Sequence, residues 1–238
     1  MNKLWTVPVL IALSGCVLNT ATVLRMQPTA VDFGDSDSVG YAIPTRRDLC
    51  GVVDFRHDPF EKGDHDLCGN TKPTPYDDYL ALRDEHNNGC AETQLPAMKD
   101  EFAGGKHFNV IVFNAGLHDF QIKVSPYGCG ASTPAKFNAA VEALATEAIG
   151  HGDVIIWVDV TPVPVGWDKI PAGIETVINP IGEAIAREHH FYILNWDSKY
   201  QLPQNVHYTE QGYEYLGQQL ADCINTAMAG QETDRCHH

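Results

Sequence analysis

Positive charge is scarce in this sequence. Its 238 residues include 16 Lys and Arg against 31 Asp and Glu, which gives a formal net charge of -15 at pH 7. No run of Lys and Arg occurs in the chain, whereas a nucleic-acid-binding surface requires such a basic footprint. We therefore expect no nucleic-acid partner. Because 44% of the residues are hydrophobic and 20% are charged, the composition predicts a globular chain rather than a disordered one.

Several spacings that are typical of metal sites and of one large hydrolase class are also missing. The cysteines form no Cys-x-x-Cys pair and the histidines form no His-x-x-x-His pair, although such pairs are common in zinc sites. We expect no metal and no cofactor. The sequence contains no Gly-x-Ser-x-Gly, which excludes the nucleophile elbow of the α/β-hydrolases.

The N-terminal apolar run is too short to span a bilayer. It covers residues 4–13, follows Lys3 and precedes Leu-Ser-Gly-Cys, so it predicts a signal peptide over residues 1–15. Leu-Ser-Gly-Cys resembles the lipobox of bacterial lipoproteins, in which the cysteine becomes the lipidated first residue. That resemblance implies a lipid anchor at Cys16, a tether over residues 16–28 and export to the periplasm or outer membrane. The alternative is an ordinary secretory signal.

Six cysteines remain once Cys16 is set apart, and an even number in an exported chain predicts three disulfides. Six cysteines allow fifteen connectivities. Proximity in the sequence favours two pairs and leaves the third by elimination: Cys50–Cys68, Cys223–Cys236 and then Cys90–Cys129. Residues 231–238 are expected to form a frayed tail.

From residue 29 onward, short apolar runs alternate with longer helical patterns. Strands are expected where the runs are nearly all apolar and β-branched, over Ala30–Phe33, Phe108–Asn114, Asp153–Val160 and Phe191–Trp196. Helices are expected over residues 76–86, 134–150, 173–188 and 209–227, and a disulfide-pinned loop over residues 48–75. The alternation predicts one α/β domain over residues 29–230, with a central parallel sheet between two helical layers.

Polar side chains follow three of the expected strands. Asp35 and Ser36 follow the first, His118 and Asp119 follow the second, and His207 comes after the last strand and a loop. Because ligands gather at the carboxyl ends of strands in an open sheet, we expect these groups to meet at one edge. A lone serine in this position would cap a turn or a helix. With a histidine within hydrogen-bond reach it becomes a candidate nucleophile.

The motifs around these residues resemble those of the GDSL, or SGNH, hydrolase family. FGDSDS (33–38) looks like the first block of that family, and NVHYTEQGY (205–213) looks like its last block. NNGCAETQ (87–94) is similar to the second block, and VIVFNAGLHDF (110–120) lies where the third block is usually found. The resemblance covers residues 29 to about 226 and implies a flavodoxin-like three-layer α/β/α sandwich.

The same resemblance implies roles for individual residues. Ser36 would be the nucleophile and His207 its general base. The oxyanion hole would consist of the Ser36 backbone N–H, a backbone N–H of the second block and the side chain of His118, which replaces the usual asparagine. Ala91 aligns with the second-block position, and Gly89 is the alternative. Asp35 and Asp119 would be supporting residues.

The sequence departs from the family pattern at the triad acid. The family carries its acid three residues before the histidine, and Gln204 occupies that position here. An amide oxygen can orient an imidazole, but it brings no negative charge to stabilise the imidazolium. Three possibilities remain open: a Ser–His dyad held by a backbone carbonyl, an acid recruited from elsewhere such as Asp197, or an inactive protein.

The function implied by the resemblance is that of an exported serine esterase. We expect Ser36 and His207 to hydrolyse short-acyl esters, above all acetyl esters on carbohydrate, through an acyl-enzyme. Three alternatives stay open: a lysophospholipase or thioesterase for longer chains, an acetyl transferase, and an inactive carbohydrate-binding lipoprotein. The expected partner is therefore a small-molecule or polysaccharide ester. Sequence alone specifies neither the substrate nor the oligomeric state.

Overall fold

Six strands form one central sheet in the computed structural model, which describes residues 27–58, 89–122, 129 and 132–238. The strands are β1 (Thr29–Phe33), β2 (Asp54–Asp58), β3 (Phe108–Phe113), β4 (Gly152–Val158), β5 (Tyr192–Leu194) and β6 (Cys236–His237). The helices of these residues are α1 (Ser36–Asp48), α3 (Ala91–Glu101), α4 (Pro134–Ile149), α5 (Glu175–Glu188) and α6 (Glu210–Met228).

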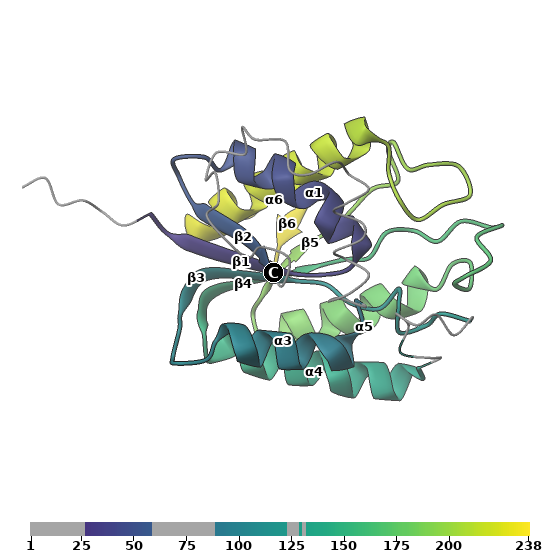
Figure 1. The fold of residues 1–238 in the computed structure, drawn as a ribbon, viewed down its shortest axis with the longest axis horizontal. Coiled ribbons are helices and arrows are strands. Elements are labelled where there is room, and N and C mark those ends of the chain that lie inside the picture. Colours follow the sequence, from purple (N-terminus) through teal and green to yellow (C-terminus); the bar gives the residue numbers. More distant parts are fainter. Residues whose placement is uncertain (1–26, 59–88, 123–128, 130–131) are drawn as a thin grey trace, which may run out of the picture.

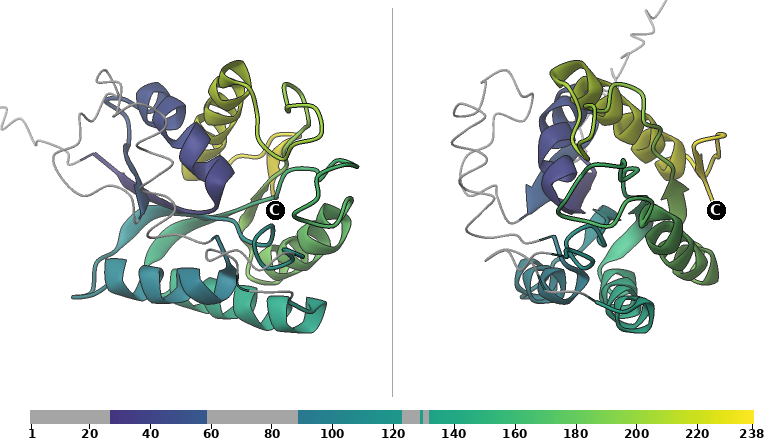
Figure 2. Two further views of the ribbon diagram at one scale, coloured as in Figure 1. Left: turned by 45° about the vertical axis from the view of Figure 1, so that its right-hand side comes forward. Right: turned by 90° about the vertical axis from the view of Figure 1, so that its right-hand side faces the viewer.

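The sheet is the middle layer of a three-layer α/β/α sandwich, as the sequence predicted. Its strand order is β2-β1-β3-β4-β5-β6, and all neighbouring pairs are parallel except β5 and β6. Helices α1 and α6 cover one face, whereas α3, α4 and α5 cover the other (Figures 1 and 2). The carboxyl ends of the parallel strands therefore lie along one edge of the sheet.

Side chains alternate between the two faces of the sheet. Because helices cover both faces, the strands are buried on both sides. In β1, Val31 and Phe33 pack in the apolar core beneath α3, α4 and α5. Ala30 packs in the opposite core, together with Tyr41 of α1. Residue 32 also belongs to this second face by alternation, but it is an aspartate that is fully buried. Burial, then the nearby charge of Asp35, raises the pKa of Asp32 well above its usual value.

The longer helices begin at the positions that the sequence indicated. The Thr133 hydroxyl accepts a hydrogen bond from the Lys136 N–H at the start of α4, and Pro134 occupies the first turn. The Thr209 hydroxyl accepts from the Gly212 N–H at the start of α6. Helix α6 then lies against α1, with Gly217 so close that an added Cβ would lie 2.4 Å from the Cβ of Pro44.

The structure corrects two expectations about irregular segments. Part of the expected loop over residues 48–75 is strand β2, which pairs in parallel with β1. Its pattern was missed because Asp54, Arg56 and His57 interrupt the apolar run. The expected frayed tail is also wrong, since β6 pairs antiparallel with β5 and a disulfide joins Cys236 to Cys223 of α6.

The cysteine pairs agree with the predicted connectivity as far as they are described. Cys90–Cys129 and Cys223–Cys236 are both disulfides, and Cys50 is disulfide-bonded. Its predicted partner Cys68 lies outside the described residues, as do the helix predicted over 76–86, the signal peptide and Cys16. No helix among the described residues is both long and apolar enough to cross a membrane.

Candidate active site

Ser36 is the first residue of α1, directly after β1 and a two-residue turn. The turn is held from two sides. The Asp35 side chain accepts a hydrogen bond from the Asp37 N–H at 2.9 Å, and the Asn114 side chain accepts from the Asp35 N–H at 3.2 Å. Asn114 itself follows β3, so the ends of two adjacent strands fix the serine. The N-terminus of α1 also carries the positive end of the helix dipole.

His207 meets Ser36 from the far end of the chain. Its Nε2 lies 2.9 Å from the Ser36 Oγ, although the two residues are 171 positions apart. Ser36 is 8% exposed, and His207 is half-buried in the loop between β5 and α6. A serine hydroxyl within hydrogen-bond distance of an imidazole is the arrangement that nucleophilic catalysis requires.

Asn205 holds the other side of the imidazole. Its Oδ1 lies 2.9 Å from the His207 Nδ1 and also accepts the His207 backbone N–H at 3.1 Å. A backbone N–H can only donate, so this second bond identifies the atom facing the ring as the amide oxygen. Nδ1 must then carry the proton, which leaves Nε2 as an acceptor toward Ser36.

Neither residue named from the sequence as an orienting group occupies this position. Gln204 has a φ of 54° and its side chain lies beside Gly166, because the left-handed turn at residue 204 directs it away from the imidazole. Asp197 accepts hydrogen bonds from the Tyr215 hydroxyl, Arg235 and the Lys199 N–H. Burial tends to raise the pKa of Asp197, but these donors outweigh burial and hold that pKa below its usual value.

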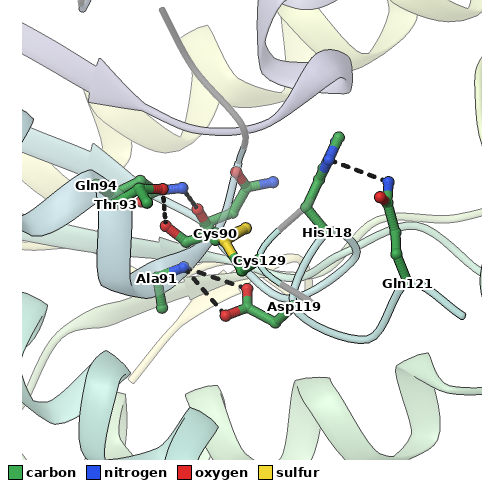
Figure 3. The surroundings of a disulfide bond; sticks show 9 residues. Cys90, Ala91, Thr93, Gln94, His118, Asp119, Gln121 and Cys129 are labelled. Carbon is green, nitrogen blue, oxygen red and sulfur yellow. Dashed lines mark hydrogen bonds between the residues drawn. A yellow bond between two sulfur atoms is a disulfide. The ribbon is translucent and has the colours of Figure 1, made fainter. Parts of the chain in front are cut away.

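Ala91 does not present its backbone N–H to Ser36. That N–H donates to both oxygens of Asp119, at 3.3 and 3.2 Å, as Figure 3 shows. The contact places a carboxylate at the N-terminus of α3, where it supports the third-block loop. Burial, partly offset by the bond from Ala91, raises the pKa of Asp119 to about 6.

Gly89 is the second-block residue that lies against the nucleophile turn. A Cβ at this position would lie 2.7 Å from His118 Cδ2 and 2.8 Å from Asp35 Cβ. Its φ of 63° is left-handed, which favours glycine. Of these two second-block residues, it is therefore Gly89 rather than Ala91 that lies against the nucleophile turn.

His118 has a fixed orientation at the rim of the same edge. Its Nδ1 lies 3.2 Å from the Gln121 Nε2, and Figure 3 shows the two side chains facing each other. With the Gln121 amide nitrogen as the donor, Nδ1 is the acceptor and a neutral ring carries its proton on Nε2. His118 can therefore donate a hydrogen bond through Nε2 without being charged.

Two residues that the sequence did not single out complete the surroundings of His207. The indole of Trp167 stands edge-on to the imidazole, with 6.0 Å between ring centroids. Thr161 donates to Asp37 Oδ2 and lies 3.2 Å from the Val206 carbonyl, so it links the nucleophile turn to the His207 loop. Both follow β4, and a search for polar and aromatic groups after that strand would have found them.

The described residues contain no group of three or more His, Cys, Asp and Glu placed to hold a metal ion. The side chains and backbone of this edge supply a hydroxyl, an imidazole with an orienting amide, and several candidate N–H donors, which together are suited to acyl transfer.

Comparisons with known proteins show which solved structures share this architecture. A GDSL-like lipase from Bacteroides thetaiotaomicron aligns with a TM-score of 0.55 and 14% identity, over 85% of this chain and 88% of that one. A variant of an acetyl-xylooligosaccharide esterase from Geobacillus aligns with a TM-score of 0.52 and 15% identity, over 87% and 96%. An acetyl xylan esterase aligns with a TM-score of 0.51 and 14% identity, over 82% and 99%.

No protein-family model matches the sequence, and no curated protein matches it significantly. At 14–15% identity, the likeness to these structures concerns the fold alone. This chain has the α/β/α fold of those lipase and esterase structures.

Proposed function

We propose that this chain is a serine esterase that uses Ser36 and His207. The observation that carries the proposal is the contact between Ser36 Oγ and His207 Nε2, together with the Asn205 oxygen on Nδ1. The fold shared with lipase and esterase structures supports it. The proposal corresponds to a Ser–His dyad in which a side-chain amide, rather than a backbone carbonyl or an acid, orients the imidazole.

Each turnover begins with attack of the Ser36 Oγ on the ester carbonyl. His207 Nε2 takes the hydroxyl proton as the new C–O bond forms, and later gives it to the departing alcohol. Water then attacks the acyl-enzyme with His207 again as base, which releases the acid and restores Ser36. Asn205 keeps the proton on Nδ1 throughout, so Nε2 is available at each step.

The developing oxyanion is stabilised by N–H groups around the nucleophile turn. We assign the Ser36 N–H, the Gly89 N–H and the Nε2–H of His118 to this role. The Ala91 N–H is not assigned, because it donates to Asp119. Removal of one such donor costs a factor of about 10²–10³ in rate in other hydrolases. His118→Ala is therefore expected to lower kcat strongly while the substrate KM changes little.

The substrate class that we propose is a short-acyl ester on carbohydrate. Two of the similar structures are named as esterases of acetylated xylooligosaccharide and acetylated xylan. Trp167 supports the same choice, since its half-buried indole lies next to His207 and gives this part of the site an apolar lining.

Hydrolysis of p-nitrophenyl esters from acetate to palmitate tests both parts of the proposal. We expect the highest kcat/KM on acetate and no activity in Ser36→Ala. A maximum at palmitate would indicate the lysophospholipase or thioesterase alternative, and transfer to an added alcohol would indicate a transferase. Failure of a fluorophosphonate probe to label Ser36 would instead identify an inactive member of the fold.

We also propose that the protein is exported and anchored by lipid at Cys16. The N-terminal Leu-Ser-Gly-Cys carries this proposal, and the disulfides Cys90–Cys129 and Cys223–Cys236 support an oxidising compartment. Metabolic labelling with radioactive palmitate is expected to mark the wild type but not Cys16→Ser. Equal label in both would contradict the anchor.

A further inference from the structure

A second Ser–His contact lies in the same turn of α1. The Ser38 Oγ is 2.7 Å from the Nε2 of His57 on β2, and both residues are fully buried. Parallel pairing of β1 with β2 places His57 opposite Asp32, next to the strand that leads into the nucleophile turn. The proposed reaction does not use this pair.

The direction of the hydrogen bonds in this pair follows from the proton of Ser38. Its hydroxyl lies 2.6 Å from the Asp35 carbonyl oxygen, to which it donates. A serine has only one hydroxyl proton, so the same oxygen can only accept from His57, whose Nε2 must then carry a proton. Burial, followed by the positive charge of Arg46, lowers the pKa of His57 to about 3. The ring is therefore a neutral donor, and the chain of bonds runs from His57 through Ser38 to Asp35.

The carbonyl at the end of this chain belongs to the peptide that joins Asp35 to Ser36. A trans peptide is planar, so its C=O and its N–H point in opposite directions. Whatever fixes the Asp35 carbonyl also fixes the Ser36 N–H, which is one of the proposed oxyanion donors. Hydrogen bonds in a row polarise one another, so a strong bond at the carbonyl also makes that N–H a better donor.

We infer that His57 and Ser38 are positioning residues for the oxyanion hole, acting through the Asp35–Ser36 peptide. The inference rests on the proposed function, since it assigns a support to a group of that same site. It adds a second layer to the site: a hydroxyl and an imidazole, both remote from the substrate, that set the direction of a backbone donor.

A comparison within α1 separates this role from an ordinary helix contact. Hydroxyls often donate back to a carbonyl three or four residues earlier, and Thr45 does so to the Tyr41 carbonyl at 2.8 Å. Thr45 is fully buried like Ser38, but the Tyr41 carbonyl that it bonds lies about one and a half turns beyond the nucleophile. Thr45→Val therefore removes an equivalent bond from the same helix without reaching the site.

The experiment compares Ser38→Ala with Thr45→Val on p-nitrophenyl acetate. We expect Ser38→Ala to lower kcat about tenfold with KM unchanged, the effect of weakening one hydrogen bond in the transition state. Affinity for butylboronic acid, which forms a tetrahedral adduct with serine, should fall by the same factor. Thr45→Val should lose similar thermal stability and keep the wild-type kcat and boronate affinity.

Two substitutions at His57 provide a second test of the inference. His57→Gln carries an N–H at the position of Nε2 and should retain most of the wild-type kcat, whereas His57→Leu should reproduce Ser38→Ala. Wild-type kcat and boronate affinity in Ser38→Ala, or equal losses in His57→Gln and His57→Leu, would overturn the inference. If Ser36→Ala is inactive in the same assays, the proposed function survives that result. A wild-type protein without esterase activity would overturn both.

Discussion

The first turn of α1 carries two serines that each contact a histidine, and the two contacts have opposite chemistry. Ser36 faces His207 at 2.9 Å at the edge of the sheet, whereas Ser38 faces His57 at 2.7 Å in the interior. In the first pair the proton of Nδ1 is committed to Asn205, so Nε2 accepts. In the second pair the serine proton is committed to Asp35, so Nε2 donates.

The difference shows that a short Ser–His distance does not by itself define a catalytic pair. The donor and acceptor roles in each pair depend on a second hydrogen bond. In the first pair the His207 Nδ1 bonds an amide oxygen, and in the second the Ser38 hydroxyl bonds a backbone carbonyl. Exposure then completes the distinction. Ser36 is 8% exposed and can reach an ester, while Ser38 is completely buried and cannot.

The largest effect is expected at the nucleophile. Ser36→Ala should lower kcat on p-nitrophenyl acetate by about 10⁴-fold or more, because no other hydroxyl can attack from this position. Steady-state kinetics measure the effect, and an unchanged circular dichroism spectrum provides the control. Residual activity within tenfold of the wild type would mean that Ser36 and Ser38 do not differ as proposed.

Removal of the orienting amide should have the next largest effect. Asn205→Leu leaves Nδ1 without its acceptor, so the imidazole can rotate and protonate on either nitrogen. We expect kcat to fall about a hundredfold, with little change in melting temperature because the loop lies at the surface. The kcat of Gln204→Leu should stay close to that of the wild type, which provides the matched control. Equal losses in the two variants would refute the assignment of Asn205.

The buried pair should also govern stability in acid. Because the pKa of His57 is lowered to about 3 in the folded state, the unfolded chain binds a proton first as the pH falls below about 6.5. The stability that neutral His57 contributes to the folded state is thus present above pH 6.5 and is lost as the pH falls toward 3. Between pH 6.5 and 5 the free energy of unfolding should drop about 2 kcal/mol more in the wild type than in His57→Gln.

Urea unfolding at the two pH values measures this difference directly. A protonated His57 cannot be accommodated in the interior next to Arg46, whereas the glutamine variant has nothing to titrate there. Parallel pH dependences in the wild type and in His57→Gln would show that His57 is not a buried neutral donor.

The smallest effect, and the only gain, is expected from Asn205→Asp. A carboxylate at this position would stabilise the imidazolium of His207 in the transition state, so we expect kcat to rise about tenfold. It would also raise the apparent pKa of the acid limb of the kcat profile, because a nearby negative charge favours the protonated ring. A pH–rate profile of the variant tests both. A fall in kcat at every pH would argue against the dyad.

The fold could be predicted from the sequence for a physical reason. Buried parallel strands are nearly continuous apolar runs, as in Phe108–Phe113, and such runs are visible without a structure. The same pattern failed for β2, because Asp54, Arg56 and His57 are polar and His57 is buried only with the help of Ser38. A buried polar residue has no signature in a hydropathy pattern.

The partner of the His207 Nδ1 was missed for a related reason. Gln204 stands where the resemblance implied an acid, but its left-handed backbone turns it toward Gly166 and brings Asn205 to the imidazole. A shift of one residue in a loop changes which side chain points inward. The Ala91 N–H likewise donates to Asp119 at the start of α3, a contact that the sequence did not indicate.

The sequence by itself determined the layered architecture and indicated Ser36 and His207 as a pair, since both inferences depend on residue type and on order along the chain. The tertiary structure alone decided the hydrogen-bond directions: which nitrogen of His207 carries the proton, and which carbonyl takes the proton of Ser38. Those directions depend on single atoms brought together from distant segments at distances of about 3 Å. Such placements are outcomes of packing, and no local pattern of residues encodes them.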